Sequence, residues 1–349
     1  YNENRTRMSE GDAKWFVNNS NNWKTVSGMY YKDSRSDLAL EIFKEALIAY
    51  GQIGGSEEEG LGDNINVNLA IILMRDEDYR SAITELERVS ETSPDYLRAM
   101  RLKAQCKWMQ FERGGGKDRK LAEEAFGLYD TFIRDITAKM NASEDEDEKK
   151  SYLKELLKGK ARFIEVLYKE KEYERVIKGI DEFWKTPPAD KRTGLTAARY
   201  QVFSAIKFKV DTSKYNGLLK KEAYMVQARE ILEKMGKEFP EAEEDIVNIM
   251  KVLGFSFYNL ASRFDALDKE RENKRAIDAA GSLLYDFVFK GGEKVDEGVL
   301  INVADILHSK VRDYTRSERV TEKVLQIFEK RIDGVYPPYE PETKAQLQE

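Results

Sequence analysis

The stretch from Leu69 to Pro94 constrains the fold of this chain more than any other. Its apolar residues recur every three or four positions, which is the spacing of one face of a helix. They are Leu69, Ala70, Leu73, Ala82, Leu86 and Val89. A polar turn at residues 75–78 separates the two groups, and Pro94 closes the second because proline lacks a backbone donor. The stretch therefore predicts two short helices joined as a hairpin.

The apolar triplet of the second helix recurs along the chain. Its first members lie 40 to 52 residues apart, and Pro94, Pro188 and Pro240 each follow one of them by 12 residues. The seven copies are Ala39, Phe43 and Ala46; Ala82, Leu86 and Val89; Ala125, Tyr129 and Phe132; Val176, Ile180 and Phe183; Ala228, Leu232 and Met235; Ala280, Leu284 and Phe287; and Val320, Val324 and Ile327. In the copy led by Ala280, Ala276 or Ile277 fits the lead position equally well. The recurrence predicts an array of helical hairpins.

The hairpin resembles a tetratricopeptide repeat (TPR), a pattern with a Leu-small pair, a bulky residue, a Tyr after the turn, further small and bulky residues and a closing proline. The matching residues are Leu69, Ala70, Leu73, Tyr79, Ala82, Leu86 and Pro94, whereas Asn66 and Val89 depart from it. The resemblance implies an all-α, right-handed superhelical solenoid of six or seven hairpins over residues 23–333. We expect a polar arm or cap at residues 1–22 and a Pro-rich tail at 334–349.

The remaining first helices are expected between the triplets, with polar inserts between hairpins. The helices fall at 97–111, 157–169, 195–209, 246–264 and 299–314, and the inserts are GGGKDRK, SEDEDEKK, DTSKYNGLLKK and DKEREN. Inserts of this kind map to one edge of a solenoid.

Composition argues against several classes of protein. The 58 Lys and Arg residues against 64 Asp and Glu give a net charge of -6, and a nucleic-acid binder would need a basic stripe. No apolar run reaches the length that spans a bilayer, so we expect a soluble protein without direct membrane insertion. Cys106 is the only cysteine, so no internal disulfide can form.

Catalytic motifs are missing from the sequence. His308 is the only histidine, and its sole possible thiol partner, Cys106, falls on a helix several repeats away; we expect His308 to be a partly buried structural residue. The GGGK sequence ending at Lys117 lacks the Ser or Thr and the preceding strand of a phosphate loop. The chain is therefore expected to be no enzyme and to need no cofactor and no metal.

The TPR resemblance implies a concave groove lined by first helices, which would bind protein. One step past each bulky packing residue lies a large side chain, and charged or polar residues stand between these. The groove candidates are Met74, Trp108, Tyr168, Phe208 and Tyr258, with Arg101, Gln105, Glu165, Lys169 and Lys251. A slip of one residue would place Trp108 and Tyr258 in inter-helix packing instead, and both alternatives stay open. The clamp of chaperone-tail binders has no counterpart at Val67, Ile71, Ala161 and Glu165.

The ends of the chain carry aromatic residues that suit contacts. Trp15 and Phe16 would either cap the array or reach a neighbouring subunit, and Tyr336 and Tyr339 lie in the tail. Because the chain begins with Tyr1, it is either a processed protein or a trimmed piece. We favour processing, which predicts export to a periplasm or an organelle lumen over a cytoplasmic location.

These features together predict a non-catalytic scaffold for protein–protein interaction and complex assembly. The partners would be subunits of a large enzyme complex or other copies of the chain, as for TPR subunits of tubule-forming enzyme complexes. The alternative is a ligand-binding module for a peptide or an oligosaccharide in the periplasm or at the cell surface, because aromatic residues also stack on sugars.

Overall fold

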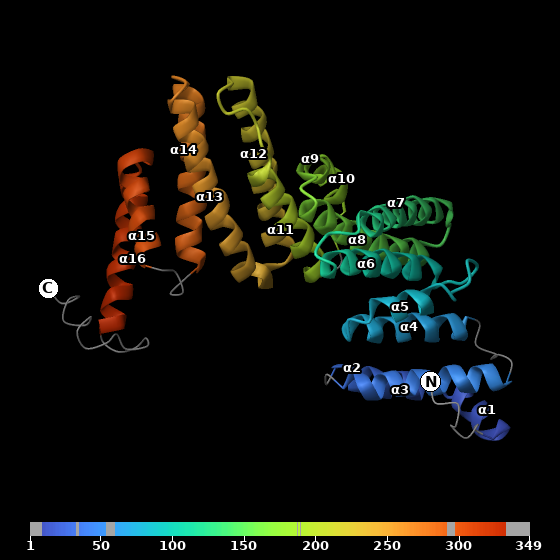
Figure 1. Ribbon diagram of the computed structural model, residues 1–349. Helices are drawn as coiled ribbons and strands as arrows, with labels where there is room; N and C mark the ends of the chain where they lie inside the picture. The colour runs from blue at the N-terminus through green and yellow to red at the C-terminus, as the bar shows by residue number, and fades with distance from the viewer. Residues whose placement is uncertain are drawn as a thin grey trace. The chain divides into compact units, whose positions relative to one another are not determined.

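The computed structural model describes residues 9–32, 35–53, 60–186, 188, 190–291 and 297–332, and within them every regular element is a helix. The chain divides into two compact units, residues 1–163 and 164–349, and the division falls inside one helix, α8. Consecutive helices pack on one another along each unit (Figure 1). The architecture is an all-α helical repeat array.

Unit 1 pairs its helices in sequence order. Helix α3 packs against α1, α2 and α4, and α4 with α5 and α6 with α7 form the next two pairs (Figure 1). The helices are α1 (Glu10–Asn18), α2 (Ser20–Lys32), α3 (Ser36–Ile53), α4 (Leu61–Arg75), α5 (Tyr79–Leu86), α6 (Tyr96–Arg113), α7 (Arg119–Ala142) and α8 (Glu146–Lys169). Residues 164–169 of α8 belong to unit 2.

Unit 2 continues the same pairing. Helix α11 packs on α9 and α12, and α13 with α14 and α15 with α16 form further pairs. The elements are α9 (Tyr173–Lys178), α10 (Ile180–Phe183), α11 (Lys191–Lys207), α12 (Tyr215–Glu238), the 3₁₀ turn η1 (Pro240–Ala242), α13 (Glu243–Asp265), α14 (Glu270–Gly291), α15 (Glu297–Asp305), the π-helical η3 (Ile306–Val311) and α16 (Tyr314–Ile332).

Four hairpins share one turn conformation. Each has a non-glycine residue in the left-handed region, namely Glu77 (φ 63°), Lys171 (φ 65°), Asp268 (φ 55°) and Arg312 (φ 57°), and the next helix begins two residues later. In the first three turns the following amide donates to the carbonyl five residues back, as in a Schellman helix end. In the fourth, Asp313 donates to Leu307, six residues back, because η3 is a π-helix. The recurrence shows that the hairpin is a structural repeat.

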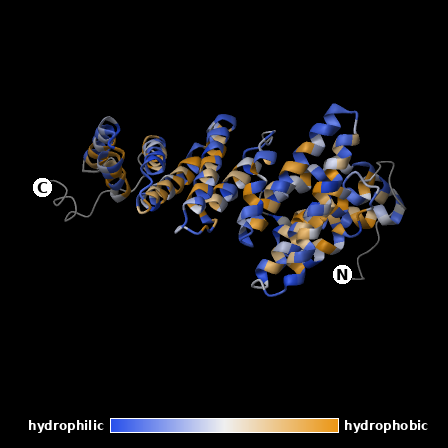
Figure 2. Cartoon of the chain, turned by 90° about the horizontal axis from the view of Figure 1, so that it is seen from above, coloured by the Kyte–Doolittle hydropathy of each residue, from blue (hydrophilic) through white to orange (hydrophobic). Residues whose placement is uncertain are grey.

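The seven predicted triplets form the repeated core. All 21 of their side chains are buried, with exposed fractions of 8% or less, and Figure 2 shows apolar and polar residues sharing each helix. Val89 is buried although α5 ends at Leu86. Ala276 and Ile277 are buried beside Ala280, so all three proposed lead positions of that copy lie in the core. The predicted packing face is confirmed.

Several predicted boundaries need correction. Residues 10–18 and 20–32 are helical, and α1 packs Ala13 and Val17 into the core beside α3, as a cap would. The insert SEDEDEKK mostly belongs to α8, because Asp145 accepts the amides of Asp147 and Glu148 and acidic side chains suit a helix N-terminus. Within the described residues, no helix is long and apolar enough to cross a membrane.

Gly159 of α8 allows the close approach of α7. A Cβ atom at this position would overlap the ring of Phe132, whereas Gly127 of α7 has open space around it. We therefore expect Gly159→Ala to lower the free energy of unfolding by about 1–2 kcal/mol, because overpacking outweighs the gain in helix propensity. Gly127→Ala is the matched control and should raise it by about 0.5–1 kcal/mol. Denaturant titration compares the two, and a stabilising Gly159→Ala would contradict the packing.

Candidate binding site

The predicted groove residues of α6 lie on one helical stripe that packs against neighbouring helices. Trp108 is 3% exposed, and its ring lies 5.1 Å from that of Phe111 and 6.4 Å from that of Phe126 on α7. Trp108 thus occupies the inter-helix position that a one-residue slip predicts. Gln105 is half-buried on the same stripe, and Met74 on α4 is half-buried against the core of unit 1.

Arg101 belongs to an ion pair between helices. Its Nη2 donates to Oε2 of Glu155 on α8 at 3.1 Å, and Lys158 approaches the same carboxylate at 2.6 Å. Burial lowers the pKa of Arg101, which Glu155 opposes. Burial alone would raise the pKa of Glu155, but the two cations hold it below its ordinary value. Arg101 therefore stabilises unit 1 rather than facing a ligand freely.

Glu165, Tyr168 and Lys169 come together in unit 2. The hydroxyl of Tyr200 on α11 donates to Oε1 of Glu165 at 3.2 Å, and Lys169 pairs with that atom at 3.2 Å. The ring of Tyr168 lies 5.0 Å from that of Tyr200. Burial raises the pKa of Tyr200, and the carboxylate of Glu165 raises it further. This contact set joins the end of α8 to α11.

A lysine covers the outer face of this aromatic group. The Nζ atom of Lys207, the last residue of α11, lies 4.9 Å from the ring centroid of Tyr168. The hydrogen bond to the Tyr168 hydroxyl raises the pKa of Lys207. Such cation–π contacts add up to about 1 kcal/mol at an exposed site. Lys207 therefore stays charged at the surface.

Phe208, the next residue, is the C-cap of α11 and packs on α12. Its ring meets that of Tyr224 edge-on at 5.2 Å, and Nζ of Lys220 lies 4.9 Å from its centroid. Lys220 also pairs with Glu174 at 3.2 Å. Phe208 is half-buried, so one part of its ring reaches the surface.

Lys251 and Tyr258 share a stripe of α13 directed at α14. Nζ of Lys251 lies 5.7 Å from the ring of Phe287 on α14, and Tyr258 is half-buried two turns further along. Ser256, Asn259 and Arg263 form another stripe, which is rotated from the first by roughly 120° around the helix axis. The outward-facing surface of α13 thus includes residues that are not among the predicted groove residues.

That second stripe lines a hollow that we call the basic pocket. It lies between the end of α11, the loop that follows, the start of α12 and the C-terminal half of α13, and its volume is about 490 Å³. Its lining residues are Ile206, Lys207, Phe208, Lys209, Val210, Thr212, Leu218, Lys221, Met225, Ser256, Asn259, Leu260 and Arg263. Phe208 is the one predicted groove residue among them.

Lys221 neutralises the helix end at the floor of the basic pocket. Its Nζ donates to the carbonyl oxygens of Ala205 at 2.7 Å and Phe208 at 2.8 Å, and also to that of Ile206. These carbonyls form the negative end of the α11 dipole, which a cation stabilises. Burial lowers the pKa of Lys221 to about 8, and the three carbonyl acceptors favour the charged form.

All charged side chains that line the basic pocket are positive. Four of its lining side chains are basic and none is acidic. Lys209 and Arg263 are exposed and make no ion pair with any residue that the structure describes. Asp211 lies in the same loop, but its carboxylate accepts from Ser213 and pairs with Lys214. The pocket is therefore a concentrated positive patch on a chain of net charge -6.

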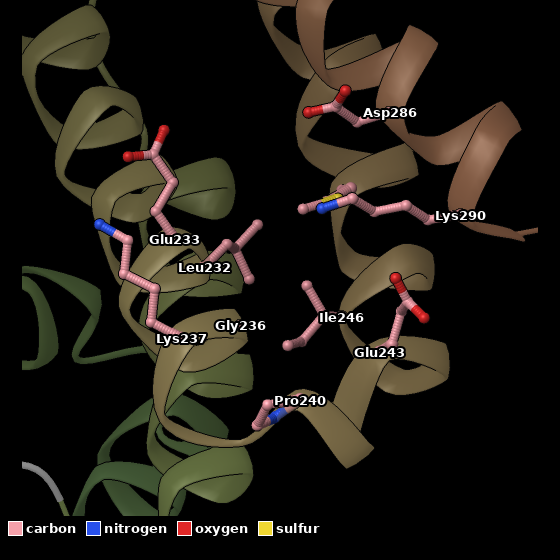
Figure 3. A pocket seen from close by; sticks show the side chains of 10 residues that line it. Leu232, Glu233, Gly236, Lys237, Pro240, Glu243, Ile246, Asp286 and Lys290 are labelled. Carbon is pink, nitrogen blue, oxygen red and sulfur yellow. The ribbon is translucent and has the colours of Figure 1, made fainter.

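A second hollow of about 460 Å³ lies between α12, η1, α13 and α14. Figure 3 shows Leu232 and Ile246 on its opposite walls, with Glu233, Lys237, Glu243, Asp286 and Lys290 around it. Three carboxylates and two ammonium groups give no preference for either sign of ligand. We call this hollow the mixed-charge cleft.

The other residues considered from sequence lie apart from these hollows. Trp15 is 65% exposed and is not docked against the described residues, while the side chain of Phe16 and the whole of Tyr336 and Tyr339 lie outside them. His308 is exposed in η3, 5.2 Å from the ring of Tyr314, which corrects the expectation of partial burial. Cys106 is buried, and burial raises its pKa to about 12.

The sequence around the basic pocket has a local excess of positive charge that was not among the predicted site features. Residues 206–221 contain five lysines and one aspartate, a local positive excess in an acidic chain. The sequence predicts a polar insert at residues 211–221, but α12 begins inside it at Tyr215.

No family model matches this chain, and no curated protein matches its sequence. Among solved structures, it is similar to a "Circular tandem repeat protein with novel repeat topology and enhanced subunit contact surfaces". That comparison has a TM-score of 0.29 and 12% sequence identity, and it covers 92% of this chain and 78% of the other.

Proposed function

We propose that this chain is a non-catalytic TPR-type scaffold that binds a protein partner through the first helices of its hairpins. The observation that supports this proposal best is the basic pocket, which opens between α11 and α13, the first helices of consecutive hairpins. The triplet side chains of the second helices are buried in the core and cannot contact a partner. We therefore propose that exposed side chains of the first helices recognise the partner.

The surface around the pocket suits a protein ligand. Phe208 and Tyr168 present part of their rings beside lysines, and aromatic residues dominate the energetics of protein interfaces. Ser256, Asn259 and Thr212 add polar groups that can hydrogen-bond a peptide backbone. We propose partners among the subunits of a larger complex, assembled in part on this array.

Photo-crosslinking tests where the partner lies. A photoreactive residue at Asn259, which is exposed on α13, is expected to form covalent adducts with a partner in the native extract. The same residue at Asp278, which is exposed on α14, is the matched control and should give several-fold less adduct. Equal adducts from both positions, or none from either, would contradict binding through the first helices.

A further inference from the structure

We propose that the basic pocket binds an acidic segment of a partner protein, with two or more carboxylate side chains meeting its cations and apolar side chains meeting its walls. This inference rests on the scaffold function proposed above and names the chemistry of the partner. Lys207, Lys209 and Arg263 supply the charge at the surface, and the pocket has no acidic lining residue of its own.

The cations are arranged around the pocket rather than at one point. Lys207 is the last residue of α11, Lys209 lies in the loop that follows, Arg263 lies on α13 and Lys221 lies on α12. Lys221 donates to three carbonyls and offsets the helix dipole, and Lys207 lies over the ring of Tyr168. The exposed charges of Lys209 and Arg263 are therefore the ones that can meet a ligand most directly. Separate cations suit separate carboxylates along a segment better than the single centre of a phosphate.

The apolar part of the lining also favours a polypeptide. Ile206, Phe208, Val210, Leu218, Met225 and Leu260 contribute to the walls. A volume of about 490 Å³ falls in the range of roughly 300–1,000 Å³ that ligand sites occupy. An acidic segment that also carries leucine or a similar residue can bury apolar area there while its carboxylates remain paired.

Charge complementarity between the pocket and an acidic segment determines the affinity of binding and its dependence on salt concentration. Lys209 and Arg263 are exposed, so their attraction for a ligand is screened at higher ionic strength. They make no competing ion pair with the described residues. Removing their charge should therefore weaken binding without disturbing the fold.

A peptide titration tests the inference with the full chain. The probe is a fluorescein-labelled peptide of alternating Glu and Leu, and its Gln and Leu counterpart controls for charge. We expect the acidic peptide to bind, with the Kd raised at least tenfold by the double change Lys209→Glu and Arg263→Glu. The matched control, Lys234→Glu with Lys274→Glu, changes two exposed lysines outside the pocket and should alter the Kd less than twofold.

The outcomes separate this inference from the scaffold proposal. Equal affinity of both double variants, or binding of the Gln peptide as tight as the acidic one, would overturn the acidic segment as ligand. Displacement of the acidic peptide by millimolar inorganic phosphate would also overturn the proposal and would indicate a site for small anions. A tenfold gain in affinity for the acidic peptide after removal of residues 333–349 would overturn the proposal, because it would show that the chain's own tail occupies the pocket. In each case, adducts that persist from Asn259 but not Asp278 would leave the scaffold proposal standing.

Discussion

Replacing Phe132 by alanine is expected to lower the free energy of unfolding of unit 1 by about 3–5 kcal/mol. Phe132 is fully buried in α7, where it packs with Leu97 and Met100 of α6 and Leu156 of α8. Its ring also fills the space above Gly159, so its removal leaves a cavity among three helices. Native-state hydrogen exchange in the amides of α6, α7 and α8 measures this loss within unit 1.

A control and a coupled variant make this prediction specific. Arg134→Ala removes a large side chain from the exposed face of the same helix and should change stability by no more than about 0.5 kcal/mol. In the Phe132→Ala background, Gly159→Ala should stabilise rather than destabilise, because the ring that opposes a Cβ is gone. Independent, additive effects of the two changes would contradict the contact.

The repeated core could be predicted because it depends on periodicity alone. A residue and its neighbours four and seven positions on lie on one helix face, so each triplet marks the buried stripe without knowledge of its partner. The turn of the predicted hairpin has its counterpart in three others. The left-handed residues of these four turns, Glu77, Lys171, Asp268 and Arg312, share no residue type that would predict them. Local spacing predicts the hairpins and the turn at residues 75–78, but not the left-handed residue within a turn.

Helix starts were harder to predict because acidic and polar residues favour both loops and helix N-termini. The charges of residues 146–148 indicated a solvated insert, yet they form the first turn of α8. The same ambiguity hid the starts of α12 at Tyr215 and α14 at Glu270. Asp145 is a typical N-cap residue, but it stands among several other acidic residues, so its type alone does not mark the start of α8.

The candidate groove depended on a choice between adjacent helix stripes, which the sequence could not make. Large aromatic side chains suit both inter-helix packing and ligand contact, and the structure buries Trp108 but leaves Tyr168 half-exposed. On α13 the pocket uses Ser256, Asn259 and Arg263, residues without apolar bulk. Large apolar side chains therefore do not mark the stripe of α13 that lines the basic pocket.

Breaking the ion pair between Arg101 and Glu155 is expected to destabilise unit 1, because their side chains are only 12% and 26% exposed. Glu155→Gln keeps the shape of the side chain but leaves a largely buried guanidinium without its counter-charge. A fully buried pair broken in this way costs about 3–5 kcal/mol, and partial exposure reduces the expected loss to about 2–3 kcal/mol. The double change Arg101→Met with Glu155→Leu should lose less than the single variant, because no uncompensated charge remains.

The pH dependence of this loss follows from the direction of the Glu155 pKa shift. Its pKa is lower in the folded chain than its ordinary value of 4.5, so the unfolded chain binds the proton first as the pH falls. The stability that Glu155 contributes is therefore complete above the unfolded pKa and is lost as the pH falls through the folded one. Arg101 stays protonated throughout and adds no pH dependence to the free energy of unfolding.

Unfolding titrations should thus show a constant difference in the free energy of unfolding between wild type and Glu155→Gln from pH 6 to 8, and this difference should narrow below about pH 4. The control is Glu146→Gln, in the exposed pair with Lys149 on the same helix, which should leave the midpoint of unfolding nearly unchanged. A loss of stability in Glu146→Gln as large as that in Glu155→Gln would show that burial does not account for the contribution of the Arg101 pair.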